Sequence, residues 1–131
     1  GELKGKKIET DPNFAMTVVM VSGGYPGDYE KGKAIDGLET KTDALVFQAG
    51  TKITNGKIMT DGGRVLAVTG RGESLLEASE KAYERVATLT WQGVYFRKDI
   101  GVDLQSMSDQ FRSKIVNRKS KDGLCVWNKK R

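Results

Sequence analysis

The stretch of residues 43–69 constrains the fold most, because turn-forming residues divide it into short apolar runs. Asn55 and Gly56 stand between the runs 52–54 and 57–59. Both central residues of a type I′ turn need a positive φ, and Asn-Gly is the strongest short-range signal for a hairpin. The sequence therefore predicts two paired antiparallel strands here.

Two further strands are predicted within the same stretch. Residues 44–47 form a short apolar run. Residues 64–69 follow the turn 61–63, which contains two glycines, and they form a near-continuous apolar run that Arg64 opens. Such a run is typical of a strand that is covered on both faces. The stretch therefore predicts a β unit with a fully buried strand.

Residues 14–21 have the β-branched content and the length of another buried strand, and the glycine-rich loop 22–29 follows them. Three glycines and a proline around two tyrosines give a backbone that can approach a ligand closely. A plain turn capped by packed tyrosines is the competing interpretation. The candidate ligand-binding residues of the loop are Gly23, Gly24, Tyr25 and Gly27.

One helix is predicted after a connection formed by residues 30–38, which are too rich in glycine for a stable helix. Ser74 and Glu77 have the spacing of a capping box at its start. Apolar or small residues at three- and four-residue spacing predict the face that packs on the sheet. They are Leu75, Leu76, Ser79, Ala82, Tyr83, Val86 and Leu89. The side chains expected to stay mostly in solvent are Glu77, Glu80, Lys81, Glu84 and Arg85. Residues 91–96 then predict a short aromatic strand, and residues 97–101 close the folded body.

Composition limits the kind of protein that these elements can build. The chain has 131 residues, of which 37% are hydrophobic, so one domain with one core is expected. Cys125 is the only cysteine and histidine is absent, which excludes an internal disulfide and sites built on imidazole. No apolar run approaches the roughly 20 residues that a membrane helix needs. A soluble, cytoplasmic protein is expected.

The net charge of +5 is concentrated at one end of the chain. Residues 105–131 carry eight basic and two acidic side chains, whereas residues 1–104 carry 14 basic and 15 acidic ones. A nearly neutral body lacks the broad basic face that binds a phosphate backbone, so nucleic acid is not the expected partner. We consider three interpretations of this basic tail: a segment added for expression, a native extension that contacts nucleic acid, or a helix that docks on the body.

No motif identifies a reaction, since the sequence has no nucleophile elbow, Walker loop or set of metal ligands at a typical spacing. Four blocks in a fixed order give a resemblance instead. They are TVVMVSGGYPGDY (17–29), VFQAGTK (46–52), DGGRVLAVT (61–69) and YFRKDIG (95–101). Through these blocks, residues 14–104 closely resemble the C-terminal domain of phosphoribosylamine–glycine ligases, also called glycinamide ribonucleotide synthetases, with residues 1–13 as a lead-in.

The resemblance implies an ATP-grasp ligase of purine biosynthesis. Such enzymes use ATP and magnesium or manganese to convert glycine into an acyl phosphate, which the amine of 5-phosphoribosylamine attacks. It implies that ATP and the metal bind to N-terminal and ATP-grasp domains outside this fragment, so that the fragment alone is inactive. It also implies an α+β fold, predominantly β with one main helix: a small barrel-like unit similar to the C-terminal domain of biotin carboxylase.

The resemblance also implies a substrate site at Arg64. Related ATP-grasp enzymes carry a basic residue at the start of the similar strand, facing the ribose phosphate, and a guanidinium suits bidentate contact with phosphate. Lys52 is expected to help as a point charge. The competing interpretation is that Arg64 is a strand-end charge that stabilises the turn at Asp61. The family usually has histidine where Gln48 stands, which leaves only a hydrogen-bonding role for that position.

Two other functions compete with the ligase interpretation. One is a non-catalytic binding module whose basic tail contacts nucleic acid. The other is the equivalent domain of another ATP-grasp ligase.

Overall fold

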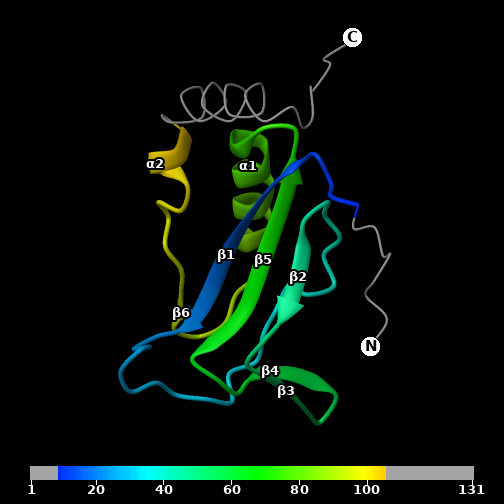
Figure 1. Cartoon of the computed structure of the whole chain (residues 1–131). Coiled ribbons are helices and arrows are strands. Elements are labelled where there is room, and N and C mark those ends of the chain that lie inside the picture. The colour runs from blue at the N-terminus through cyan, green and yellow to red at the C-terminus, as the bar shows by residue number, and fades with distance from the viewer. Residues whose placement is uncertain (1–8, 106–131) are drawn as a thin grey trace, which may run out of the picture.

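The computed structural model of the chain describes residues 9–105, which form an antiparallel sheet with one helix against one face (Figure 1). The strands of this sheet lie in the order β2-β5-β1-β6. Their bounds are β1 Phe14–Ser22, β2 Leu45–Gln48, β5 Arg64–Gly72 and β6 Val94–Tyr95. The two nine-residue strands β1 and β5 pair along their length and form the centre of the sheet. Apart from residue 105, the predicted basic tail lies outside the described residues.

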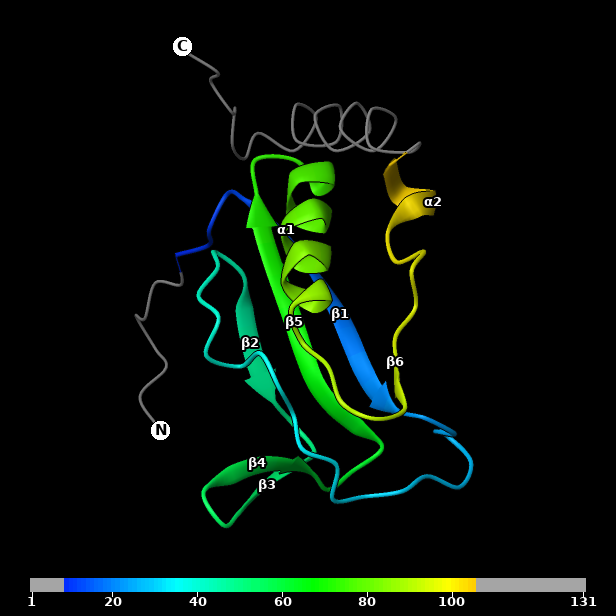
Figure 2. The same ribbon diagram turned by 180° about the vertical axis from the view of Figure 1, so that it is seen from behind.

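A separate two-stranded sheet contains β3 (Thr51–Thr54) and β4 (Lys57–Thr60). The predicted turn between them is confirmed, because Asn55 and Gly56 have φ values of 50° and 74°. Residues 30–38 form no helix and instead make backbone hydrogen bonds to β4. The hairpin is therefore held between the first connection and the end of the main sheet, as both views show (Figures 1 and 2).

The main helix, α1 (Leu75–Ala87), begins at the predicted cap. The Ser74 hydroxyl accepts a hydrogen bond from the backbone amide of Glu77 at 3.1 Å. The Glu77 carboxylate accepts one from the backbone amide of Glu73 at 2.8 Å. Two amides at the start of the helix thus obtain partners from side chains only a few residues away, which is why the sequence predicts this boundary well.

The buried face of α1 is rotated relative to the predicted one. Within the helix it consists of Ala78, Ser79, Ala82, Arg85 and Val86. The prediction that Leu76 packs on the sheet is wrong, since this residue is 53% exposed. The reason is the small residue Gly70 on β5: a Cβ there would lie 2.1 Å from the carbonyl oxygen of Ala78. Backbone thus approaches backbone at this point, and alanines face the sheet where a leucine would not fit.

The prediction that Arg85 stays in solvent is also wrong, because this residue is only 3% exposed. Its guanidinium donates to the carbonyl oxygens of Gly37 and Leu38 at 3.0 and 3.1 Å. It also donates to the Thr88 hydroxyl at 2.8 Å. A buried cation needs such partners, and here a distant turn supplies the carbonyls at the C-terminal end of α1, where a positive charge is favoured.

The predicted aromatic strand is shorter than expected. A turn precedes β6, in which the amide of Val94 donates to the carbonyl of Trp91 at 3.1 Å and Gly93 has a φ of 80°. The chain after β6 folds around Tyr83 and then forms the short helix α2 (Val102–Gln105), which was not predicted. None of the helices among residues 9–105 is long and apolar enough to cross a membrane.

The two faces of the main sheet differ sharply in burial. Figure 2 shows α1 covering one face, on which Val18, Met20, Leu66 and Val68 are fully buried. The opposite surface, here called the open face, has no cover from residues 9–105 and is seen in Figure 1. Along β1, β2 and β5 the open face consists of Ala15, Thr17, Val19, Val21, Leu45, Phe47, Ala67, Thr69 and Arg71. The α+β fold class, mostly β with one main helix, is confirmed. The strand at 14–21 was predicted to be buried and the strand at 64–69 to be covered on both faces, and both predictions are wrong within the described residues, which cover only one face of each strand.

Candidate functional site

A β-bulge decides where the Arg64 side chain lies. Met20 pairs with Leu66, but the next residue of β1, Val21, pairs with Arg64, so that Val65 is an extra residue in β5. Paired residues of neighbouring strands place their side chains on the same face. Val21 belongs to the open face, and the bulge therefore brings Arg64 there too. An unbroken register would place Arg64 opposite the buried residue Ser22 instead.

Two backbone amides hold this bulge in place. The carbonyl of Val65 accepts hydrogen bonds from the amides of Ala49 and Gly50, at 3.0 and 3.2 Å. A Cβ at Gly50 would lie 2.4 Å from the carbonyl oxygen of Arg64, so only glycine fits at this position. The segment after β2 thus fixes the backbone from which the Arg64 side chain projects.

The glycine-rich loop 22–29 lies against the same turn. The amide of Ser22 donates to the carbonyl of Gly63 at 2.8 Å, and the Ser22 hydroxyl donates to the carbonyl of Gly62 at 2.9 Å. Tyr25, whose peptide bond to Pro26 is cis, places its ring against Gly63. The structure therefore brings together the predicted loop and Arg64, which are about forty positions apart in the sequence.

The glycines of the loop differ in how strongly their surroundings exclude a side chain. Gly24 has a φ of 94°, and a Cβ there would lie 2.1 Å from the carbonyl oxygen of Asp28. A Cβ at Gly23 would lie 2.6 Å from the carbonyl oxygen of Gly93. Gly27 is less restricted, since its nearest backbone atom would be at 3.2 Å. Gly23 and Gly24 are thus required by local packing, whereas Gly27 remains a candidate for ligand contact.

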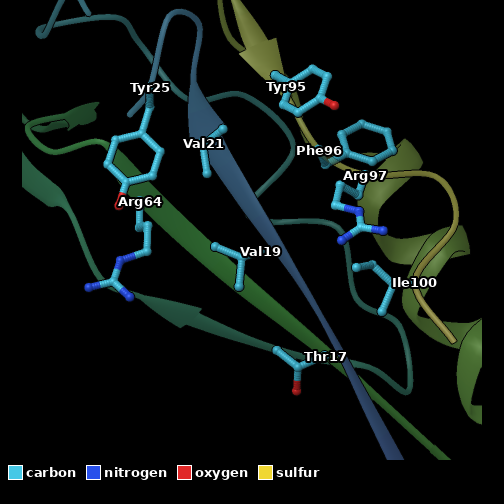
Figure 3. A pocket seen from close by; sticks show the side chains of 9 residues that line it. All are labelled: Thr17, Val19, Val21, Tyr25, Arg64, Tyr95, Phe96, Arg97 and Ile100. Atoms are coloured by element: carbon cyan, nitrogen blue, oxygen red, sulfur yellow. The ribbon is translucent and has the colours of Figure 1, made fainter. Parts of the chain in front are cut away.

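A cavity of about 330 Å³ opens between Arg64 and the segment after β6. Figure 3 shows Tyr25 and Arg64 on one side of β1 and Tyr95 and Phe96 on the other, with Val19 and Val21 between them. The cavity is lined by Thr17, Val19, Val21, Tyr25, Arg64, Tyr95, Phe96, Arg97 and Ile100. A second cavity of about 460 Å³ shares Val19, Tyr25 and Arg64 with the first. The two cavities therefore meet at Arg64, which borders a largely apolar wall.

Arg64 has no partner among the described residues, unlike Lys52 and Arg97. Its guanidinium makes no ion pair or side-chain hydrogen bond with any residue in the range 9–105. Arg97, in contrast, donates two hydrogen bonds to the carboxylate of Asp99, at 2.9 and 2.7 Å. These bonds lower the pKa of Asp99 below its ordinary value and raise that of Arg97. Arg97 is thus already paired, and Arg64 is free to bind an anion.

Lys52 is not brought to the cavities. Its ammonium group pairs with the carboxylate of Asp61 at 3.1 Å, and Lys52 lines neither cavity. Lys52, rather than Arg64, is therefore the charge that stabilises the turn at Asp61. The side-chain oxygen of Gln48 accepts a hydrogen bond from the Thr51 hydroxyl at 2.9 Å.

Several lining residues were not predicted from the sequence, among them Val19, Tyr95, Arg97 and Ile100. Val19 lies in a continuous apolar run, so no alternation of apolar and polar residues shows which side chains of this strand are exposed. The residues after Trp91 reach the cavity through β6, which pairs with the end of β1. The resemblance block at 95–101 was the only signal that pointed to this segment.

The part of the chain that the structure describes offers no magnesium site. It contains no group of three or more Asp, Glu, Cys or His side chains placed to hold a metal ion. Magnesium needs several oxygen ligands in near-octahedral geometry, so these residues do not fit the metal that the resemblance implies.

Comparison with known proteins gives the same family for most of the chain. Residues 15–103 match the family model described as phosphoribosylglycinamide synthetase, C domain. A phosphoribosylamine–glycine ligase of Caldanaerobacter subterraneus is 45% identical over 100 residues, which are 76% of this chain and 24% of that protein. The chloroplastic phosphoribosylamine–glycine ligase of Arabidopsis thaliana is 46% identical over 106 residues, 77% of this chain and 20% of that protein.

A solved structure agrees with these sequence matches. The crystal structure of a phosphoribosylamine–glycine ligase from Thermotoga maritima matches with a TM-score of 0.66 and 41% identity, over 74% of this chain and 25% of that one. The chain thus spans about a quarter of the length of the relatives that it matches. By fold and by sequence, this chain belongs to the family of phosphoribosylglycinamide synthetase C-terminal domains.

Proposed function

We propose that the chain is the C-terminal domain of a purine-biosynthesis ligase that joins glycine to 5-phosphoribosylamine, and that Arg64 binds the 5-phosphate of the amine substrate. The ligase hydrolyses ATP to ADP and phosphate and proceeds through a glycyl phosphate. The family membership supports the reaction. The observation that carries the site is the guanidinium of Arg64, which has no partner within residues 9–105 and lies beside an apolar cavity.

The backbone around Arg64 suits a phosphate contact. The bulge at Val65 is held by two amide hydrogen bonds, and the turn before it is held by Ser22. A guanidinium on such a fixed backbone can meet two phosphate oxygens at once, and little conformational freedom is lost on binding. Arg64 has no carboxylate partner among the described residues that a ligand would have to displace.

Val19 and the remaining predicted site residues form the surroundings of this contact. Tyr25 and Val19 offer an apolar wall on which the sugar ring packs, next to the phosphate. Gly27 supplies a position where the backbone of the loop can come close to the ligand, and Gly23 and Gly24 give the loop its shape. Lys52 adds a positive charge at longer range, reduced by its pairing with Asp61.

ATP and magnesium or manganese are assigned to the other domains of the full-length ligase, where the metal-bound nucleotide activates the glycine carboxylate. The residues described here bind and orient the amine substrate, and no chemical step is assigned to them. The isolated fragment is therefore expected to be inactive.

Steady-state kinetics of the full-length ligase that carries this domain test the proposal. A charge-assisted contact with phosphate contributes roughly 1.5 to 3 kcal/mol, so Arg64→Ala should lower kcat/KM for phosphoribosylamine by about ten- to a hundredfold. Arg64→Lys should restore only part of this, since an ammonium group cannot form the two-pronged contact. The KM values for ATP and glycine should stay unchanged.

Arg71→Ala is the matched control. Arg71 lies near the other end of β5, has a similarly exposed side chain and pairs with Asp11 at 3.3 Å. Its loss should leave kcat/KM for phosphoribosylamine within about twofold of the original value, because exposed pairs of this kind contribute little. An equal effect of both substitutions, or an equal loss for ATP, would refute the assignment of Arg64 to the phosphate.

A further inference from the structure

The open face is apolar over most of its extent. Val19, Leu45 and Phe47 are 40%, 44% and 53% exposed. They lie in two cross-strand rows, in which Leu45 stands beside Thr69 and Phe47 beside Ala67. The charged residues that β5 places on the open face, Arg64 and Arg71, lie near its two ends, and the positions between them are uncharged. Large, contiguous apolar surfaces of this kind usually mark sites of contact.

Between Arg64 and Arg71, the hydroxyl groups of the open face are already satisfied. The hydroxyls of Thr17 and Thr69 form a hydrogen bond with each other at 2.8 Å across β1 and β5. An antiparallel sheet that leaves one face in water normally alternates apolar and polar side chains along each strand. The alternation is missing in β1 and β5, whose sequences are suited to burial on both faces. The sequences of β1 and β5 therefore indicate that another surface covers the open face.

We infer that the open face is the surface on which the preceding domains of the full-length ligase pack, an inference that rests on the proposed function. The chain spans about a quarter of the length of the relatives that it matches, so a ligase of this family has ample polypeptide to supply the cover. The occupant is thus part of the same chain, and its contact surface is apolar.

The position of the open face relative to Arg64 supports this occupant. Val19 belongs to the open face and lines both cavities that Arg64 borders. A domain seated on Val19 and Phe47 therefore extends to the rim of those cavities and forms their missing wall. The same contact that buries the apolar side chains would enclose the phosphate site and exclude water from it, which strengthens the charge contact of Arg64.

Carbene labelling of the full-length ligase, read by mass spectrometry, tests the inference with an internal control. Phe47 on the open face and Leu76 on α1 are both 53% exposed. With labelling normalised to the unfolded protein, a fully covered interface core should leave Phe47 at least about fivefold less labelled than Leu76. Equal labelling of the two side chains would overturn the inference.

Two other occupants of the open face would give different labelling results. Protection of Phe47 that disappears on dilution would assign the open face to a second copy of the protein. Protection that disappears when residues 106–131 are deleted would assign it to the end of this chain. Either result overturns the inference.

A paired substitution gives a second, independent measurement. In the full-length ligase Phe47→Glu should lower the Tm of this domain by at least about 5 °C, whereas Leu76→Glu should change it by less than about 2 °C. Equal shifts would again overturn the inference. Neither measurement depends on turnover: a protected open face with unchanged Arg64→Ala kinetics refutes the phosphate site alone, and a bare face with the expected kinetics refutes the packing alone.

Discussion

At the scale of single residues, the contact between Tyr25 and Gly63 places an aromatic ring beside Arg64. A Cβ at Gly63 would lie 2.0 Å from a ring carbon of Tyr25. Gly63 is not among the glycines with positive φ, so it is needed for its missing side chain rather than for its backbone conformation. Gly24, in contrast, is needed for both reasons. The ring can pack this closely against the turn only because Gly63 has no side chain.

Gly63→Ala should therefore destabilise the 131-residue chain by roughly 1–3 kcal/mol, the usual effect of overpacking. In a Tyr25→Ala background the same substitution should change the free energy of unfolding by less than about 0.5 kcal/mol, since no ring is left to collide with the new methyl group. Urea unfolding of the four proteins in this double-mutant cycle measures the difference. Equal effects of Gly63→Ala in the two backgrounds would mean that the new methyl group does not collide with the Tyr25 ring.

At the scale of secondary-structure elements, α1 is joined to the first connection by Arg85. The guanidinium satisfies two carbonyls of the turn at residues 37–38 and is itself buried. A Cβ at Gly37 would lie 1.8 Å from the carbonyl oxygen of Thr88, so the turn also packs directly on the end of the helix. This contact fixes the path of the connection and, through β4, the position of the hairpin.

Arg85→Met should lower the free energy of unfolding by about 2–4 kcal/mol. It retains much of the buried apolar stem but leaves both carbonyls without donors, and each hydrogen bond to a charged group contributes roughly 1.5–3 kcal/mol. The neighbouring substitution Glu84→Met, at an exposed position, should change it by less than about 0.5 kcal/mol. Chemical denaturation of the two variants makes the comparison, and a neutral Arg85→Met would show that water replaces the guanidinium at the carbonyls.

At the scale of the whole molecule, the described residues form a sheet and a helix with a core of their own, and they leave the proposed substrate site open on one side. Every strand of the main sheet and the helix that covers it lie within residues 14–95. The core is made by α1 against β1 and β5, and no further segment is needed to bury it. The apolar open face and the cavities at its edge are where the inferred cover would lie.

The 131-residue chain should therefore fold by itself and bind no ATP. Its circular dichroism should show a cooperative thermal transition, because the core is formed within the described residues. Isothermal titration with ATP and magnesium should give no heat of binding, because no set of metal ligands is present among residues 9–105. A micromolar affinity for ATP in the isolated chain would contradict this prediction and the division of labour proposed for the ligase.

The sequence by itself determined the features that depend on near neighbours. The hairpin at Asn55 and Gly56 follows from two residues that tolerate positive φ, and the start of α1 follows from Ser74 and Glu77, three positions apart. The family resemblance, carried by blocks in a fixed order, is also a property of the sequence alone, and it named Arg64 as a candidate.

Only the tertiary structure decided the features that depend on distant partners. The burial of Arg85 depends on carbonyls more than forty positions away, and the face on which Arg64 lies depends on a bulge stabilised by the segment after β2. Whether the open face is covered depends on other segments, because the apolar pattern of β1 and β5 shows only that a cover is favourable. Local rules act through the few bonds between neighbouring residues, whereas register, cover and charge pairing are set by which segments meet in space.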